Sequence, residues 1–320
     1  MPSHSSSLNA AQLAALFSQM ERLESAGLPT FQAFSLLTQT DASLKKPLAM
    51  MQQQLKSGRP ISVAGFRAGI FDDTLKTLVH AAEISGRLAQ VYAQLASHYT
   101  NLHRRTQQIK SRLYFPAATL LIALLVQPLP ALVSAEISTP DYLRASLGRF
   151  FFMAMCALLL VRLPAILRGL GAEAEWHRLQ LIIPAVARWI MARQVNAFFF
   201  MLAMMLESGL AFNEAFPEAV ATIKNTRLKA QFDPALAMIG SGASVTDTLG
   251  KVPLIHATIL HVVNSSEQSG KLASGILHFI RQEAENLSRQ DDALAEWLPR
   301  LIYALIAAWM AYALLGSRIM

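Results

Sequence analysis

Few residues in this chain have the types and spacing that nucleotide chemistry requires. The segment Ser269-Gly270-Lys271-Leu272 contains the Gly-Lys pair of a phosphate-binding loop. Such a loop also needs a glycine five residues before the pair's glycine and a serine or threonine after the lysine. Serine stands at position 265 and leucine at 272, and Gly240-Ser241-Gly242 lacks the rest of a dinucleotide fingerprint. We therefore expect the chain neither to bind nor to hydrolyse ATP.

Histidine and cysteine give no metal-binding or nucleophilic pattern either. The histidines include the pairs His98/His103 and His256/His261, and five residues of separation place two side chains off a common helical face. The motifs HExxH and GxSxG are absent, and the single cysteine, Cys156, excludes a disulfide framework. The sequence thus predicts no catalytic residue, no cofactor and no metal site.

Charged pairs elsewhere have simpler interpretations. We expect Asp72-Asp73 and Asp291-Asp292 to lie at helix ends or in solvent, because no calcium-loop spacing surrounds them. Arg104-Arg105 is not interleaved with aromatic residues, so it favours a membrane-orientation signal over a nucleic-acid patch. No nucleic-acid contact is expected.

Composition indicates a helical protein that lies partly in lipid. Of 320 residues, 53% are hydrophobic and 15% are charged, and the mean hydropathy is +0.34. An average soluble domain has about 25% charged residues. The net charge of +7 is unevenly spread, because residues 1–112 carry 12 Lys/Arg against 6 Asp/Glu, whereas residues 170–296 carry 10 against 13. The basic excess of the first part fits acidic lipid, an acidic protein partner, or a positive-inside bias beside a membrane span.

Three apolar segments predict transmembrane helices. Residues 113–135 contain no charge, and a helix of that length reaches about 34 Å, enough to cross a hydrocarbon core of about 30 Å. Residues 149–168 and 298–317 are the second and third predicted spans, and 136–148 is a short loop. Basic residues flank the first two spans on the side away from this loop, so we expect the flanks in the cytoplasm and the loop in the periplasm. The uncharged run 194–206 is short, which predicts a buried core helix.

The most informative feature is an internal repeat. Residues 83–88 (EISGRL) match 267–272 (EQSGKL) at an offset of 184 positions. Two further matches follow the same order at nearly the same offset, 55–58 (LKSG) with 239–242 (IGSG), and 24–28 (ESAGL) with 206–210 (LESGL). Three matches in order indicate two homologous segments.

Each repeat is predicted to be a helical bundle. Leu13, Leu16, Phe17 and Met20 follow the spacing of one helix face, and other apolar stripes precede and follow the two ExSGxL segments. Gly86 and Gly270 are expected to end helices in left-handed conformations. Glu83 and Glu267 could be helix caps, partner contacts or members of salt bridges between the bundles; we expect them to stabilise the turn between two helices.

Two helical bundles separated by a pair of spans, with a last span at the C-terminus, resemble the type II secretion system F family, which includes the platform proteins of type IV pilus systems. The ExSGxL turn, present twice, carries the resemblance together with Ser-Gly at 57–58 and 241–242. The family usually has glycine before the motif glutamate, whereas Ala82 and Ser266 stand there. The repeat-motif residues, structural or partner-contacting, are Gly27, Gly58, Glu83, Gly86, Leu88, Gly209, Gly242, Glu267, Gly270 and Leu272.

The resemblance implies an all-α fold with two homologous cytoplasmic bundles and three transmembrane helices. Its segments are a first bundle at 1–112, spans at 113–135 and 149–168 around the loop 136–148, a second bundle at 169–296 and a span at 298–317. It also implies a multi-pass protein of the bacterial inner membrane with most of its mass in the cytoplasm. Its partners would be a hexameric assembly ATPase, pilin or pseudopilin subunits, other inner-membrane assembly proteins and further copies of itself.

The leading hypothesis is therefore a non-enzymatic platform that couples this ATPase to pilus or pseudopilus assembly. A small polytopic transporter or membrane enzyme is the alternative, and it requires polar residues inside the spans. The first span offers Thr119 and Gln127. A soluble helical adaptor with apolar runs in its core is a third possibility.

Overall fold

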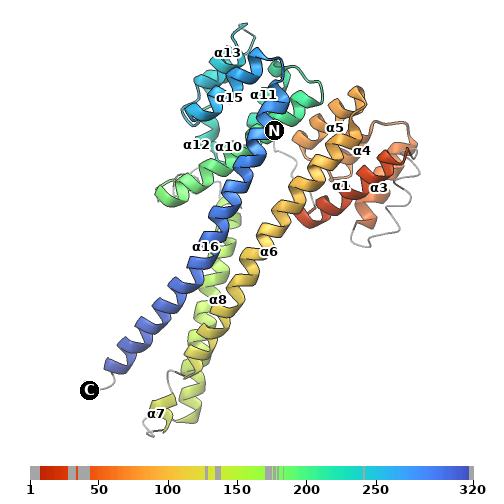
Figure 1. Ribbon diagram of the computed structural model, residues 1–320. Coiled ribbons are helices and arrows are strands. Elements are labelled where there is room, and N and C mark those ends of the chain that lie inside the picture. The colour runs from red at the N-terminus through yellow and green to blue at the C-terminus, as the bar shows by residue number, and fades with distance from the viewer. Residues whose placement is uncertain are drawn as a thin grey trace. The chain divides into compact units, whose positions relative to one another are not determined.

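The computed structural model describes residues 8–27, 34, 44–126, 129–133, 138–169, 175, 178, 180–182, 184–240 and 242–316, and the account below concerns these residues. Every regular element among them is a helix, which confirms the all-α prediction (Figure 1). Chain contacts divide the protein into two compact units. Unit 1 combines residues 1–104 with 180–287, and unit 2 combines 105–179 with 288–320.

Among the described residues, the first repeat contributes four helices and the start of a long one. They are α1 (Ala10–Ser25), α3 (Lys45–Lys56), α4 (Ile61–Arg67), α5 (Asp73–Ser85) and α6 (Leu88–Val126). Side chains fix two of the helix starts: Asn9 forms a capping box with Gln12 before α1, and Asp72 accepts from the N–H of Leu75 at 2.8 Å before α5.

The second repeat follows the same design. It contains α10 (Pro184–Glu207), α11 (Phe212–Ala221), α12 (Thr226–Ala230), α13 (Asp233–Met238), α14 (Val245–Gly250), α15 (Ala257–Gln268) and α16 (Leu272–Gly316). The helices α14, α15 and α16 each begin 184 positions after α4, α5 and α6. The offset of the sequence motifs is thus also the offset of the folded elements.

Buried residues of both repeats form one continuous cluster in unit 1. The predicted stripe of α1 lies in it, because Leu13, Leu16, Phe17 and Met20 are all buried. The run 194–206 also belongs there: Phe198 and Phe199 are 0% exposed, so the predicted core helix is confirmed. Phe198 packs edge-on against Phe216 of α11, with ring centroids 5.6 Å apart. Apolar burial of this kind is the main stabilising contribution in the unit.

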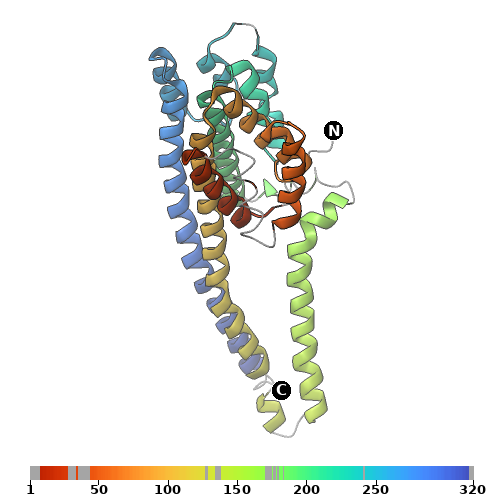
Figure 2. The ribbon, with the colours of Figure 1, turned by 90° about the vertical axis from the view of Figure 1, so that its right-hand side faces the viewer.

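Unit 2 contains the apolar part of α6, the short α7 (Leu129–Val133), α8 (Thr139–Gly169) and the last part of α16. Figure 2 shows α6 and α8 running in opposite directions, joined through α7. The hydroxyl of Tyr142 donates to the carbonyl of Leu125 at 2.8 Å. Arg112 on α6 donates to the carbonyl of Asp292 on α16 at 3.1 Å and lies 3.9 Å from the carboxylate of Glu296.

Two of the described helices are long and apolar enough to cross a membrane, namely α6 and the part of α10 between Val186 and Glu207. In α10 the apolar residues of the second half are buried in the core of unit 1. In α6, by contrast, large apolar side chains are exposed in unit 2: Tyr114, Phe115, Leu121, Ile122, Leu125 and Val126. Within the described residues, α8 and α16 are not among these helices, so the second and third spans stay predictions.

Candidate functional site: glutamate caps and the junction between repeats

The motif glutamate of the first repeat caps a helix that lies far from it in sequence. Helix α4 begins after Pro60, whose side chain cannot accept a hydrogen bond from the first turn. The carboxylate of Glu83, on α5, takes that role, accepting from the N–H of Ile61 at 2.7 Å and from the hydroxyl of Ser62 at 3.1 Å. A carboxylate satisfies the free N–H groups of a helix start and also interacts favourably with the helix dipole.

Glu267 does the same in the second repeat with closer geometry. Its carboxylate accepts from the N–H of Val245 at 2.6 Å, the N–H of Thr246 at 2.9 Å and the hydroxyl of Thr246 at 2.6 Å. The sequence separations, 22 and 21 residues, equal those of Glu83 from its two partners. Both glutamates therefore cap a helix, and the segment that each one stabilises is the start of α4 or α14. The expectation that they hold the turn after α5 and α15 was wrong about the partner.

The hydrogen bonds change the acidity of Glu267. Burial alone acts to raise its pKa, but the Thr246 hydroxyl and the N–H groups of Thr246 and Val245 favour the charged form. Their combined effect is larger, so the pKa of Glu267 lies below its ordinary value. The carboxylate is thus ionised at neutral pH, which is the form that the cap requires.

The glycines of the two ExSGxL segments make the predicted turns. Gly86 has φ of 68° and Gly270 has φ of 69°, and the residue after each donates to a carbonyl at 2.9 Å, that of Ala82 or Ser266. These bonds close the ends of α5 and α15 in the manner of a Schellman motif. A side chain with a Cβ is costly in that left-handed conformation.

The other motif residues lie at similar positions in the fold. The remaining four glycines also have positive φ, and they are Gly27, Gly58, Gly209 and Gly242. Leu88 and Leu272 are the first residues of α6 and α16; Leu88 is buried and Leu272 is partly buried against the core. Whether any of them contacts a partner protein stays a prediction.

Ser266 stands where the family usually has glycine, and a glycine on the next helix, Gly275, lies against it. A Cβ at Gly275 of α16 would overlap the Oγ and Cβ atoms of Ser266 on α15. The equivalent positions of the first repeat hold alanine at 82 and valine at 91. The second repeat thus places its larger residue on the first helix of the pair and its smaller residue on the second.

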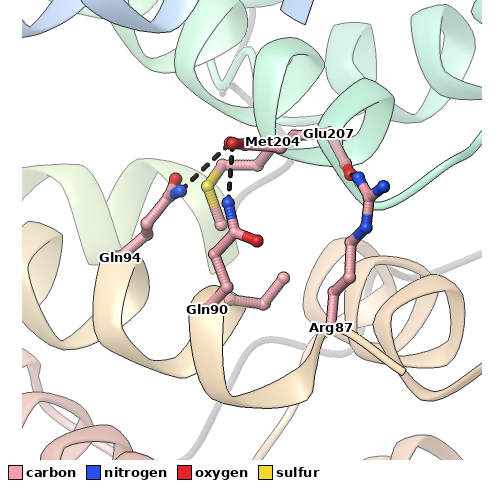
Figure 3. A pocket seen from close by; sticks show the side chains of 6 residues that line it. Arg87, Gln90, Gln94, Met204 and Glu207 are labelled. Atoms are coloured by element: carbon pink, nitrogen blue, oxygen red, sulfur yellow. Dashed lines mark hydrogen bonds between the residues drawn. The ribbon is translucent and has the colours of Figure 1, made fainter. Parts of the chain in front are cut away.

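The two repeats meet at Glu207, which ends α10 (Figure 3). Its carboxylate accepts from the side-chain amide of Gln90 at 2.7 Å and from that of Gln94 at 3.0 Å, both on α6. Its carbonyl accepts from the guanidinium of Arg87. Together with Val91 and Met204 these residues enclose a space that has no room for a water molecule. This cluster, which we call the Glu207 junction, is a filled contact and not a ligand site.

A second acidic residue of the same repeat also faces the first repeat. Burial raises the pKa of Glu218 on α11, and the charge of Asp73 adds to the shift, while Lys76 and a hydrogen bond from Thr77 oppose it. At Glu207 and at Glu218 the second repeat thus supplies a carboxylate. The first repeat supplies hydrogen-bond donors to these carboxylates and the cation of Lys76. Glu207 and Glu218 were not among the site residues predicted from the sequence. The sequence feature that pointed toward such contacts was the opposite net charge of the two parts of the chain.

The nearest approach to a phosphate loop and one of the histidines have other structural roles in the described residues. The segment 269–271 connects two helices, α15 and α16, whereas a phosphate loop follows a strand. The ring of His98 stacks on Phe200 with centroids 4.4 Å apart. Within the described residues, no group of three or more His, Cys, Asp or Glu side chains is placed to hold a metal ion.

An internally repeated, all-helical architecture with a glutamate-capped bundle in each half defines the class of this protein. Residues 16–133 and 198–317, one segment from each repeat, match the family of type II secretion system protein F. The chain belongs to this family. Proteins of the family are inner-membrane components of secretion systems.

Individual relatives agree with the family match. Type II secretion system protein F of Pseudomonas aeruginosa is 24% identical over 306 residues, which cover 88% of this chain and 75% of the relative. The protein of the same name from Vibrio cholerae is 21% identical over 330 residues, covering 95% and 80%. The type IV pilus assembly protein TapC of Aeromonas hydrophila is 21% identical over 323 residues, covering 92% and 78%.

Proposed function

We propose that the chain is a non-enzymatic platform of the bacterial inner membrane, on which a separate cytoplasmic ATPase drives assembly of a pilus or pseudopilus. The observation that carries the proposal is the family match in both repeats, at 16–133 and 198–317. Relatives named for type II secretion and for type IV pilus assembly support both kinds of filament. The partners are the ATPase, pilin or pseudopilin subunits, other inner-membrane assembly proteins and further copies of the chain.

The topology that we propose has three spans, 113–135, 149–168 and 298–317, with both repeats in the cytoplasm. Arg104, Arg105, Lys110 and Arg112 precede the first span, and this basic flank supports a cytoplasmic location for the chain before that span. The single helices α6 and α16 each begin in a repeat and continue into an apolar segment. A tilt of a repeat therefore has a direct covalent path into the proposed spans.

The proposed energy source lies outside the chain. Filament assembly requires work, and the nearest approach to a phosphate loop in this sequence is a turn between two helices. The Thr119 hydroxyl in the first proposed span donates to the carbonyl of Phe115 at 3.0 Å, a bond within its own helix. The hydroxyl is therefore satisfied within its own helix and is not a free polar group for a transported substrate, so it does not support the transporter alternative.

The proposal is tested in cells. Deleting the gene should abolish surface filaments or secretion of the system's substrate, and the full chain should restore them. A reporter fused after Met320 should behave as periplasmic, and one inserted near Lys224 as cytoplasmic. Unchanged filament and substrate levels in the deletion strain would contradict the proposed function. A cytoplasmic signal at both reporter sites would contradict the proposed topology.

A further inference from the structure

Large apolar side chains are exposed at the start of α10 and in the turn before it, whereas those in the second half of α10 are buried or partly buried. Ile182, Val186 and Trp189 are 63%, 38% and 37% exposed, whereas Phe198 and Phe199 are 0% exposed. Val186 and Trp189 are three positions apart on α10, which places them on one helix face, and Ile182 lies in the turn that precedes the helix. The apolar face thus continues beyond the part of α10 that the core of unit 1 covers.

Basic residues accompany these apolar side chains, and acidic residues are absent from the sequence around them. No Asp or Glu occurs between Glu175 and Glu207. Arg178 and Arg188 are exposed, and the guanidinium of Arg193 lies 4.3 Å from the ring centroid of Trp189. Tryptophan with arginine beside aliphatic side chains is the composition of segments that lie at a membrane–water interface.

We propose that the segment 178–193 binds the surface of an anionic membrane. Trp189, Val186 and Ile182 enter the headgroup layer, and Arg178 and Arg188 contact lipid phosphates. The proposal rests on the inner-membrane topology proposed above. It adds a direct lipid contact made by a segment of the cytoplasmic part of the chain.

Charge, area and chain length favour lipid over a protein partner. Each basic residue near an anionic surface strengthens binding about fivefold, and this stretch has no acidic residue to oppose it. A stable protein interface buries roughly 800 Å² on each partner, far more than three partly exposed side chains offer. Helix α8, which contains the second proposed span, ends at Gly169, and α10 begins at Pro184. The chain between them spans at most about 50 Å, which limits how far the segment can lie from the end of the proposed span.

The test uses the full chain in lipid nanodiscs with one fluorescent label. Because Cys156 is the only cysteine, Cys156→Ser with Val186→Cys gives a single attachment site. Quenching by a nitroxide on the lipid headgroup then measures proximity to the membrane surface. Ile84→Cys, an isoleucine that is 75% exposed on α5, is the matched control site.

With 30% phosphatidylglycerol we expect at least threefold stronger quenching at position 186 than at 84. Pure phosphatidylcholine, or Arg178→Gln with Arg188→Gln, should remove most of that difference, whereas Lys229→Gln with Lys251→Gln should not. Equal quenching at 84 and 186, or quenching at 186 that is indifferent to phosphatidylglycerol and to both arginines, would overturn the proposal. Crosslinking of label sites at 186 between two chains without quenching would also overturn it, in favour of a second copy. Failure of the chain to stay in the nanodisc would instead contradict the membrane topology.

Discussion

The carboxylate of Glu267 accepts a hydrogen bond of 2.6 Å from the backbone N–H of Val245, the first residue of α14. This bond joins two helices of the second repeat, and Glu83 with Ile61 repeats it in the first. Conservation of the geometry across the two halves of the chain indicates that the cap holds each bundle together.

Removing the cap should loosen the start of α14. We expect Glu267→Ala to destabilise this region by about 1–2 kcal/mol, the usual effect of losing a helix N-cap. Hydrogen–deuterium exchange of the full chain in detergent should then be several-fold faster at Val245 and Thr246. Glu285→Ala, an exposed glutamate on α16, is the control and should leave exchange there unchanged. Equal exchange in Glu267→Ala and its parent would contradict the capping role.

The same cap predicts a pH dependence. The pKa of Glu267 is lowered in the folded protein, so its stabilising effect is complete above the ordinary value of 4.5 and is lost as pH falls through the lower folded-state pKa. Acid should therefore speed exchange at 245–246 in the parent after correction for intrinsic rates. The Glu267→Gln variant should show no such acid effect.

The pKa of Glu218 is shifted in the opposite direction to that of Glu267. Its pKa is raised, chiefly by burial, so the folded state favours the protonated form. Its contribution to stability is present below the ordinary value of 4.5 and is lost as pH rises through the higher folded-state pKa. Glu218→Gln should accordingly raise the melting temperature at pH 7 and change it least at low pH. A lower melting temperature at pH 7 would contradict this assignment.

Because Gly270 has a left-handed conformation, we expect its substitution to lower stability more than substitution of a glycine with ordinary helical angles. Gly270→Val should destabilise the second repeat by roughly 1–3 kcal/mol, because valine is strained at φ of 69°. Gly250 lies in α14 without a positive φ and with open space around it, so Gly250→Ala should have a much smaller effect. Thermal unfolding of the full chain in one detergent compares the two. Indistinguishable melting of Gly270→Val and its parent would show that the turn tolerates a branched side chain.

Periodicity was sufficient to predict the helices but not their long-range contacts. The stripe from Leu13 to Met20 and the turn glycines at 86 and 270 follow local rules, so the sequence predicted them correctly. The bond from Glu83 to Ile61 joins residues 22 positions apart on different helices. No local pattern specifies which helix start a distant carboxylate reaches, so the sequence predicted the adjacent turn as the partner of Glu83. The internal repeat does indicate that the two glutamates have equivalent partners, since each lies 22 and 21 positions from the residues it caps.

The junction between the repeats shows a similar limit. A net positive first part and a net negative second part are visible in the sequence, but charge totals do not say which residues meet. The structure brings Glu207 to Gln90, Gln94 and Arg87, so part of the basic excess faces the other repeat. Exposed cations elsewhere on the first repeat, such as Lys45, remain the better candidates for contact with another protein.

The Glu207 junction should fix the two repeats relative to each other. Glu207→Ala leaves the amides of Gln90 and Gln94 without their carboxylate partner, and the loss of charge-assisted hydrogen bonds costs about 1.5–3 kcal/mol each at most. We expect a broader distribution of distances between spin labels placed on α3 and α13. Glu214→Ala, an exposed glutamate on α11, should leave that distribution narrow. A distribution unchanged by Glu207→Ala would mean that apolar packing alone holds the repeats.

Binding to the assembly ATPase of the same system tests the platform account most directly. The full chain in nanodiscs should bind the purified ATPase, should do so more weakly at high salt, and should show no ATP hydrolysis alone. Replacing the exposed cations Lys45, Lys46 and Arg67 of the first repeat by glutamate should weaken binding at least tenfold. The same replacement at Lys229, Lys251 and Arg281 of the second repeat should not. ATP hydrolysis by the chain alone, or absence of any binding to the ATPase, would contradict the account.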